Sequence, residues 1–182
     1  MKLNLANLTG AIVATCLVAA ALVGCDERPA TTRSGKTHPM NVKPPPKELV
    51  AKIRALRDFK DYAAPDPIVS LEEFFAGNED LGSIGCNLPD HPGMAAFYAQ
   101  MKAIRERPGV QGVFVAIHEL DEETIWPFSE CVYIITSAPA TEVSKWMQKL
   151  QPSEVSPGWL YKEPPNAPKL REGMSPVSCW WD

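Results

Sequence analysis

Two short apolar segments separated by a polar loop constrain the fold of this chain most. In residues 110–117, Val113, Val115 and Ile117 alternate with their neighbours, which is typical of a half-buried strand. Residues 131–136 (CVYIIT) form a second apolar run of strand length. The stretch between them is too short for the helix that a parallel crossover requires, so the two segments are predicted to pair antiparallel.

Helix patterns precede and follow these strands. Residues 47–61 repeat apolar side chains at three- and four-residue steps, and a capping box that starts at Ser70 (SLEE) predicts a short second helix. A third helix is predicted after an N-cap at Asp90 and a fourth after an N-cap at Thr141, with a last strand at residues 177–181. This order predicts an α+β fold with amino-terminal helices followed by a β-β-α-β unit. That unit should form a small, mostly antiparallel sheet covered by helices on one face.

The amino terminus has the pattern of an export signal. An apolar run at residues 11–23 follows Lys2 and is shorter than the roughly 18 apolar residues of a membrane span. The motif LVGC at residues 22–25 resembles the lipobox of bacterial lipoproteins. That resemblance implies that residues 1–24 are a signal peptide that is removed, and that the thiol of Cys25 carries a lipid such as palmitate. The alternative is an ordinary secretory signal that ends in a chance cysteine.

Composition divides the rest of the chain into a tether and a folded domain. Residues 25–47 contain few large apolar side chains and end in three prolines, so the lipidated cysteine is expected to begin a flexible, basic, Pro-rich tether. Residues 48–182 are expected to form a single globular domain. The lipobox resemblance implies a cell-envelope protein, anchored in a membrane and facing the periplasm. Asp26 resembles the inner-membrane retention signal of enteric bacteria and favours that membrane.

The distribution of charge narrows the class of partner. The chain has a formal net charge of −4, and residues 66–130 contain twelve acidic but only three basic side chains. Nucleic-acid binding depends on Lys and Arg that displace counterions, so no nucleic-acid partner is expected. A protein partner with a basic surface fits this charge better.

An acidic loop between the two central strands is the candidate partner-binding element. It holds four carboxylates within five residues and is followed by an aromatic side chain that could support binding: Glu119, Asp121, Glu122, Glu123 and Trp126. The spacing does not match a calcium loop, and nothing specific indicates metal binding or acid–base catalysis. A merely solvated loop, and a structural role of Trp126 in the core, remain the alternatives.

Three cysteines remain in the predicted mature chain. Cys131 and Cys179 lie in predicted strands and are favoured as a disulfide pair in an exported protein, although other pairings or no bridge remain open. Their wide spacing does not indicate zinc. Cys86 lies in a glycine-containing turn, and its neighbours match no protease signature. A structural role is therefore favoured over a catalytic pair with His91 or His118.

Five short motifs mark residues 66–182: FFAGN at 74–78, SIGCN at 83–87, WPFS at 126–129, GW at 158–159 and WWD at 180–182. They resemble the landmarks of a family of small uncharacterised bacterial proteins, a resemblance that implies no activity and no site residues. The architecture, a small acidic domain behind a lipoprotein signal, is similar to that of periplasmic immunity proteins. The expected function is that of a lipid-anchored envelope binding protein, namely an immunity protein or inhibitor that occludes a toxin or hydrolase.

Two other classes of function stay open. One is a structural lipoprotein that supports an envelope assembly, and the other is a hydrolase that uses Cys86 or the carboxylates. No cofactor, no metal and no catalytic residues are expected, because no metal-binding, phosphate-binding or nucleophile motif is present.

Overall fold

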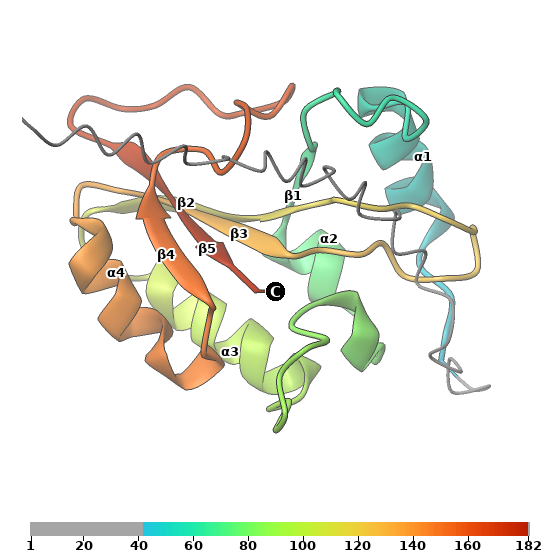
Figure 1. The fold of residues 1–182 in the computed structure, drawn as a ribbon, viewed down its shortest axis with the longest axis horizontal. Helices are drawn as coiled ribbons and strands as arrows, with labels where there is room; N and C mark the ends of the chain where they lie inside the picture. Colours follow the sequence, from blue (N-terminus) through green and yellow to red (C-terminus); the bar gives the residue numbers. More distant parts are fainter. Residues whose placement is uncertain (1–41, 182) are drawn as a thin grey trace, which may run out of the picture. The chain divides into compact units, whose positions relative to one another are not determined.

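The computed structural model describes residues 42–181, which form a five-stranded antiparallel sheet packed against helices (Figure 1). The strand order across the sheet is β1-β2-β3-β5-β4. The strands are β1 (Ile68–Ser70), β2 (Val110–Ala116), β3 (Cys131–Thr136), β4 (Glu154–Pro157) and β5 (Ser175–Trp180). The α+β class and the antiparallel pairing of the two central strands are therefore confirmed, with Val113 opposite Ile134 and Val115 opposite Val132.

Helices cover one face of the sheet and bury the main core against it. The helices that contribute to this core are α1 (Lys47–Leu56), α2 (Leu71–Phe75), α3 (Met94–Arg105) and α4 (Ala140–Met147). Figure 1 shows α3 and α4 along the same side of the sheet. Phe97, Met101 and Ile104 of α3 are fully buried there against β2, because their three- and four-residue spacing places them on one side of the helix.

The opposite face of the sheet is covered by the long segment between β4 and β5 rather than by a helix (Figure 1). Tyr133 of β3 and Trp159 of this segment meet edge to face, with ring centroids 4.8 Å apart. They belong to a second, smaller apolar cluster with Ile68, Ala116 and Cys131. The prediction that helices cover one face is confirmed, and the other face has an irregular cover.

Two side-chain amides fasten this cover to the sheet. The Ile68 N–H donates to Asn166 Oδ1 (3.0 Å), and Asn166 Nδ2 donates to the Ile68 carbonyl (2.7 Å). Gln111 makes the equivalent pair, donating to the Lys169 carbonyl and accepting from the Arg171 N–H, each at 2.8 Å. The Asn166 amide thus occupies backbone groups of the edge strand β1 that would otherwise be open to another strand.

Several element boundaries differ from the predictions. Helix α1 ends at Leu56 because Arg57 adopts an extended backbone, with φ −149°. Helix α3 begins after Gly93, whose φ of +92° favours glycine, rather than after Asp90. Helix α4 begins after Pro139 and not Thr141. Helix α2 has the predicted capping box at Ser70, which is confirmed.

The folded part of the chain begins earlier than predicted. Val42 packs against the main core, and Pro45 is buried. The Lys43 carbonyl accepts a hydrogen bond of 2.8 Å from the indole N–H of Trp126. Residues 42–47, assigned to the tether from their composition, therefore belong to the domain. The proposed signal peptide, Cys25, Asp26 and the rest of the tether lie outside the described residues.

The predicted disulfide between Cys131 and Cys179 is wrong. Both are free, buried cysteines on the neighbouring strands β3 and β5. Cys179 pairs with Val132 and faces the main core, whereas Cys131 pairs with Trp180 and faces the second cluster. Because successive side chains of a strand point to opposite faces, the two sulfur atoms lie on opposite sides of the sheet.

Candidate functional site

The acidic loop between β2 and β3 projects carboxylates from a fixed base. The backbone groups of Glu119 and Phe128 pair across the base, with the Phe128 N–H 2.9 Å from the Glu119 carbonyl. Leu120 and Trp126 are buried on either side of the tip, which leaves residues 121–124 exposed. The tip is thus held between two buried anchors rather than hanging from the ends of the strands.

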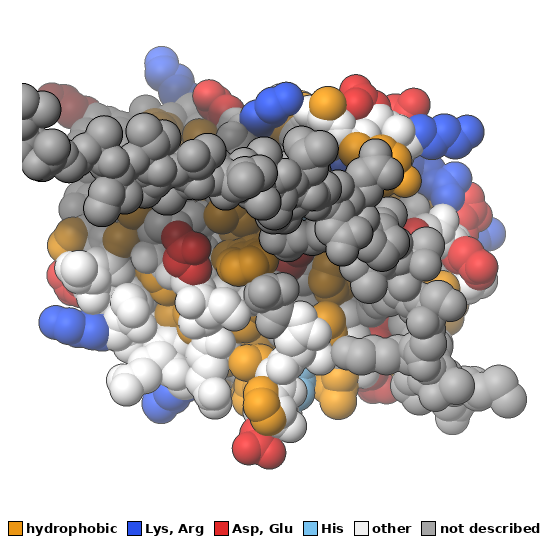
Figure 2. Space-filling model, viewed as in Figure 1, with side chains coloured by type: hydrophobic (Ala, Val, Ile, Leu, Met, Phe, Trp, Pro, Cys, Tyr) orange, Lys and Arg blue, Asp and Glu red, His pale blue; other side chains and the backbone are white. Residues whose placement is uncertain are grey.

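The carboxylates of this loop differ in their surroundings. Glu119 is only partly exposed, whereas Asp121, Glu122 and Glu123 are exposed. Glu123 pairs with Arg54 of α1 at 3.2 Å, and Asp121 and Glu122 form no ion pair with another described residue. Figure 2 shows acidic and basic side chains side by side at the edge where Figure 1 places α1 and this loop.

Trp126 does not belong to the exposed surface. Its side chain is 2 % exposed, and its indole N–H is used by the Lys43 carbonyl. The expectation that Trp126 contacts a partner is therefore corrected. Its large buried area instead anchors the loop and the amino-terminal segment to the core.

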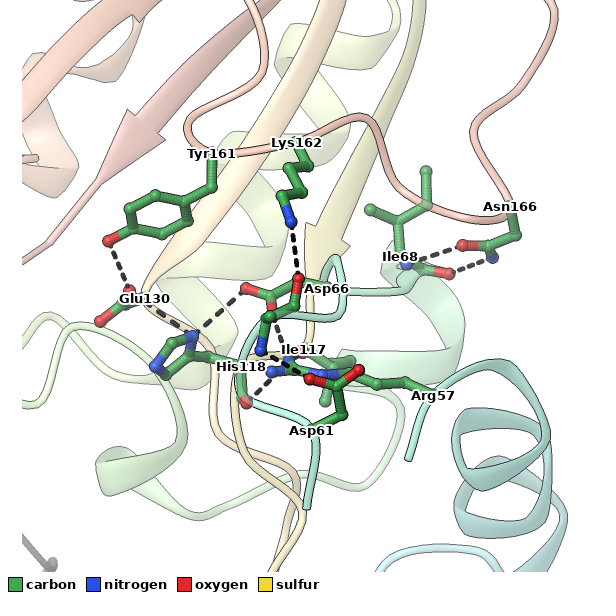
Figure 3. Close-up of polar contacts among 11 residues, drawn as sticks. Arg57, Asp61, Asp66, Ile68, Ile117, His118, Glu130, Tyr161, Lys162 and Asn166 are labelled. Atoms are coloured by element: carbon green, nitrogen blue, oxygen red, sulfur yellow. Dashed lines mark hydrogen bonds and ion pairs between the residues drawn. The ribbon is translucent and has the colours of Figure 1, made fainter. Parts of the chain in front are cut away.

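Apart from the acidic loop, a second group of polar side chains gathers around Arg57, Asp66 and His118 (Figure 3). The buried guanidinium of Arg57, directly after α1, forms an ion pair with Asp66 and donates to the carbonyl of His118 (3.1 Å). Asp66 Oδ2 lies 3.2 Å from His118 Nδ1. These contacts join the segment before β1 to the end of β2. Arg57 Nε is buried without a hydrogen-bond partner among the described residues.

His118 connects this ion pair to Glu130. Its Nδ1 also lies 3.7 Å from Glu130 Oε1, which accepts from the Tyr161 hydroxyl at 3.4 Å. The hydrogen bond to Asp66 raises the pKa of His118 above its ordinary value of 6.5; burial opposes this, and the nearby charge of Glu130 adds to it. The arrangement favours an imidazolium that holds both carboxylates.

A pocket of about 250 Å³ lies beside this network, and Glu130 is not among the residues that line it. Its polar wall contains Arg57, Asp66 and His118, with Tyr133 of β3 beside them. Tyr62 and Tyr161 also line it, and their side chains are 91 % and 65 % exposed. Lys162 reaches across from the β4–β5 segment, and its Nζ donates to the Ala63 carbonyl at 2.8 Å (Figure 3).

No sequence pattern predicted this pocket. His118 was considered only as a partner for Cys86, and Arg57 only as part of the solvated basic face of the helix predicted at residues 47–61. The pattern gave no reason to consider the other lining residues Asp66, Tyr62, Tyr161 and Lys162. The available signal was an arginine within the amphipathic pattern of residues 47–61 and a histidine at a strand end, which by themselves indicate nothing specific. Only the return of the β4–β5 segment brings Tyr161 and Lys162 to them.

The environment of Cys86 gives no support to the predicted alternative of a catalytic pair with His91. Both ring nitrogens of His91 contact the backbone: Nδ1 accepts from the Gly93 N–H and Nε2 lies 2.9 Å from the Ile84 carbonyl. His91 therefore has no ring nitrogen left to take a proton from a thiol. His118 lines the pocket described above, to which Cys86 does not contribute.

Two features are absent from residues 42–181. No group of three or more His, Cys, Asp or Glu side chains among them is arranged to hold a metal ion. Within the same residues, no helix combines the length and the apolar character that a membrane crossing requires.

Comparison with known proteins places this α+β domain in a family. The chain belongs to the YfbO family of uncharacterized proteins, whose family model matches residues 45–179. It is 38 % identical over 126 residues to "Uncharacterized protein YfbO" of Escherichia coli (strain K12), a match that covers 69 % of this chain and 89 % of that protein. No solved structure matches the chain significantly. The expected membership in a family of small uncharacterised bacterial proteins is confirmed.

Proposed function

We propose that this protein is a lipid-anchored, non-enzymatic binding protein of the cell envelope whose acidic loop engages a protein with a basic surface. The single observation that carries the proposal is the loop itself: exposed carboxylates at residues 121–123 on a tip fixed by Leu120 and Trp126. A fixed tip loses less conformational freedom on binding than a mobile one, and its charge would accelerate encounter with a cationic partner.

The location and the class of partner rest on the sequence. The lipobox at residues 22–25 supports lipid anchoring at Cys25 and exposure to the periplasm. In that setting an immunity protein or inhibitor would use the loop to occlude the cationic cleft of a toxin or hydrolase. A structural lipoprotein of an envelope assembly would use the same loop to hold a neighbouring component.

Metabolic labelling with palmitate tests the anchor. The wild-type chain and the Cys16→Ser variant, which alters a cysteine inside the same apolar run, should both incorporate label. The Cys25→Ser variant should not incorporate it and should accumulate as uncut precursor. Label retained by Cys25→Ser would contradict lipid anchoring at this residue.

Photo-crosslinking in cells tests the binding surface. A photoreactive amino acid is placed at Glu122 in the loop tip and, as a control, at Glu172, which is also acidic and exposed but lies in the β4–β5 segment. A basic protein should be captured at position 122 and not at position 172. Capture of a toxin or hydrolase supports the inhibitor, and capture of an envelope-assembly component supports the structural alternative. Equal capture at both positions, or none at 122, contradicts the proposal.

A further inference from the structure

The pocket between the residue 57–66 segment and the β4–β5 segment has the chemistry of a small ligand site, which is separate from the acidic loop. A buried ion pair, a half-buried histidine, exposed tyrosines and a lysine surround a cavity of about 250 Å³. We infer that it binds a single sugar residue that carries a carboxylate, such as a uronic acid, as a free sugar or as one residue of a glycan.

The size of the pocket limits the ligand to about one ring. Pockets that enclose drug-sized molecules measure roughly 300–1,000 Å³. A volume of about 250 Å³ falls just below that range and suits one pyranose ring with its substituents. A longer glycan would extend past the rim, where Tyr62 and Tyr161 are exposed.

The two exposed tyrosines provide apolar surfaces for the ring. Large apolar side chains are exposed at only four places among the residues on which burial is described, and Tyr62 and Tyr161 are two of them. Both line this pocket although they lie 99 positions apart in the sequence. Aromatic faces pack against the C–H surface of a pyranose, and tyrosine combines such a face with a hydroxyl that can bond a sugar hydroxyl.

Unused donors on two residues that line the pocket favour a carboxylate on that ring. Lys162 Nζ donates one of its three N–H groups to the Ala63 carbonyl, so two donors remain. The Nε2 of His118 forms no hydrogen bond with any other described residue, while Nδ1 faces Asp66 and Glu130 (Figure 3). Hydrogen bonds from charged donors to a carboxylate are stronger than those between neutral groups.

The charge balance of the site makes this preference depend on pH. The positive charges of the site are those of Arg57, Lys162 and protonated His118. The negative charges are those of the Asp66 and Glu130 carboxylates, and Glu119 adds a more distant one. When His118 loses its proton, Nδ1 keeps its hydrogen toward the carboxylates and Nε2 becomes an acceptor. The site then loses both a positive charge and a donor, so a carboxylate ligand is released while a neutral sugar is little affected.

Titration of the full chain, in mild detergent, with three small probes tests the inference. D-glucuronate has the ring and the carboxylate, D-glucose has only the ring, and acetate has only the carboxylate. At about pH 6 glucuronate should bind at least about tenfold more tightly than either of the others, and its affinity should fall at least about fivefold as the pH rises through the raised pKa of His118. The affinity for glucose should stay constant over this range.

Two variants assign the effects to the pocket. Lys162→Gln should weaken glucuronate binding towards the level of glucose, whereas Lys145→Gln, which alters an exposed lysine of α4, should leave it unchanged. Tyr161→Ala should weaken both sugars by a similar factor. Equal affinity for glucuronate and glucose, no binding of either sugar, or loss in the Lys145→Gln control would overturn the inference. The comparison of probes on the wild-type chain decides it even if a variant fails to fold.

Discussion

At the scale of single residues, His118 determines how the polar cluster responds to pH. Its imidazolium lies between Asp66 and Glu130, and the hydrogen bond to Asp66 raises its pKa. A basic group with a raised pKa contributes stability that is complete below its unfolded pKa and is lost as the pH rises through its folded pKa.

The free energy of unfolding should therefore fall as the pH rises from about 6.5 through the raised pKa of His118. Since the His118 side chain is 35 % exposed, solvent screens the pair and the loss should be about 1 kcal/mol or less. Urea unfolding at several pH values measures it. The His118→Gln variant should lack this component, and an identical pH profile in the two proteins would contradict the assignment.

Cys131 and Cys179 should be less reactive thiols than Cys86. Burial raises the pKa of Cys131 to about 12 and raises that of Cys179 as well, which keeps both protonated and unreactive. In the native protein a maleimide should label Cys86 well before either of them. After denaturation the number of labelled cysteines should be the same with and without prior reduction. A bridge between Cys131 and Cys179, identified by peptide mapping of the unreduced protein, would contradict the strand register.

At the scale of elements, two amide side chains hold the β4–β5 segment that supplies Tyr161 and Lys162. Asn166→Ala should leave both hydrogen-bonding groups of Ile68 without a protein partner and cost about 1–2 kcal/mol of unfolding free energy. Hydrogen exchange at the Ile68 amide should accelerate. The Gln148→Ala control, which removes an exposed amide side chain, should change neither quantity. Unchanged exchange at Ile68 would show that Asn166 does not protect the edge strand.

Elements with strong local patterns were predicted well, and short ones were missed. The capping box at Ser70 and the strand at residues 131–136 appear as predicted, because their residue types specify them locally. Strands β1 and β4 hold only three and four residues, too few for an alternating pattern. The N-cap predicted at Asp90 is wrong, since Gly93 with its positive φ starts α3 three residues later.

The two candidate sites also differ in how far the sequence could predict them. The acidic loop could be located because it is contiguous in sequence. The indole N–H of Trp126, however, bonds to the carbonyl of Lys43, which lies far from it along the chain. The pocket is formed by residues between 57 and 162, and no local pattern relates them. The disulfide prediction failed because it considered only that both cysteines lie in strands, without the register that places them on opposite faces.

At the scale of the whole molecule, the domain presents two surfaces built from different segments. The acidic loop lies between β2 and β3, next to α1, and the pocket lies under the β4–β5 segment. Changes at the loop tip should therefore leave ligand binding in the pocket unchanged, and Lys162→Gln should leave the loop unaffected, because none of the tip residues 121–124 lines the pocket.

The most direct test of the central claim is the salt dependence of association between the full chain and the protein captured at Glu122. Charge-driven encounter is screened by salt, so the association rate constant should fall at least about tenfold between about 0.05 M and about 0.5 M NaCl. A variant with Glu119, Asp121, Glu122 and Glu123 changed to their amides should associate slowly at both concentrations, with an unchanged free energy of unfolding. If this variant associates at the wild-type rate at low salt, the acidic loop is not the binding element.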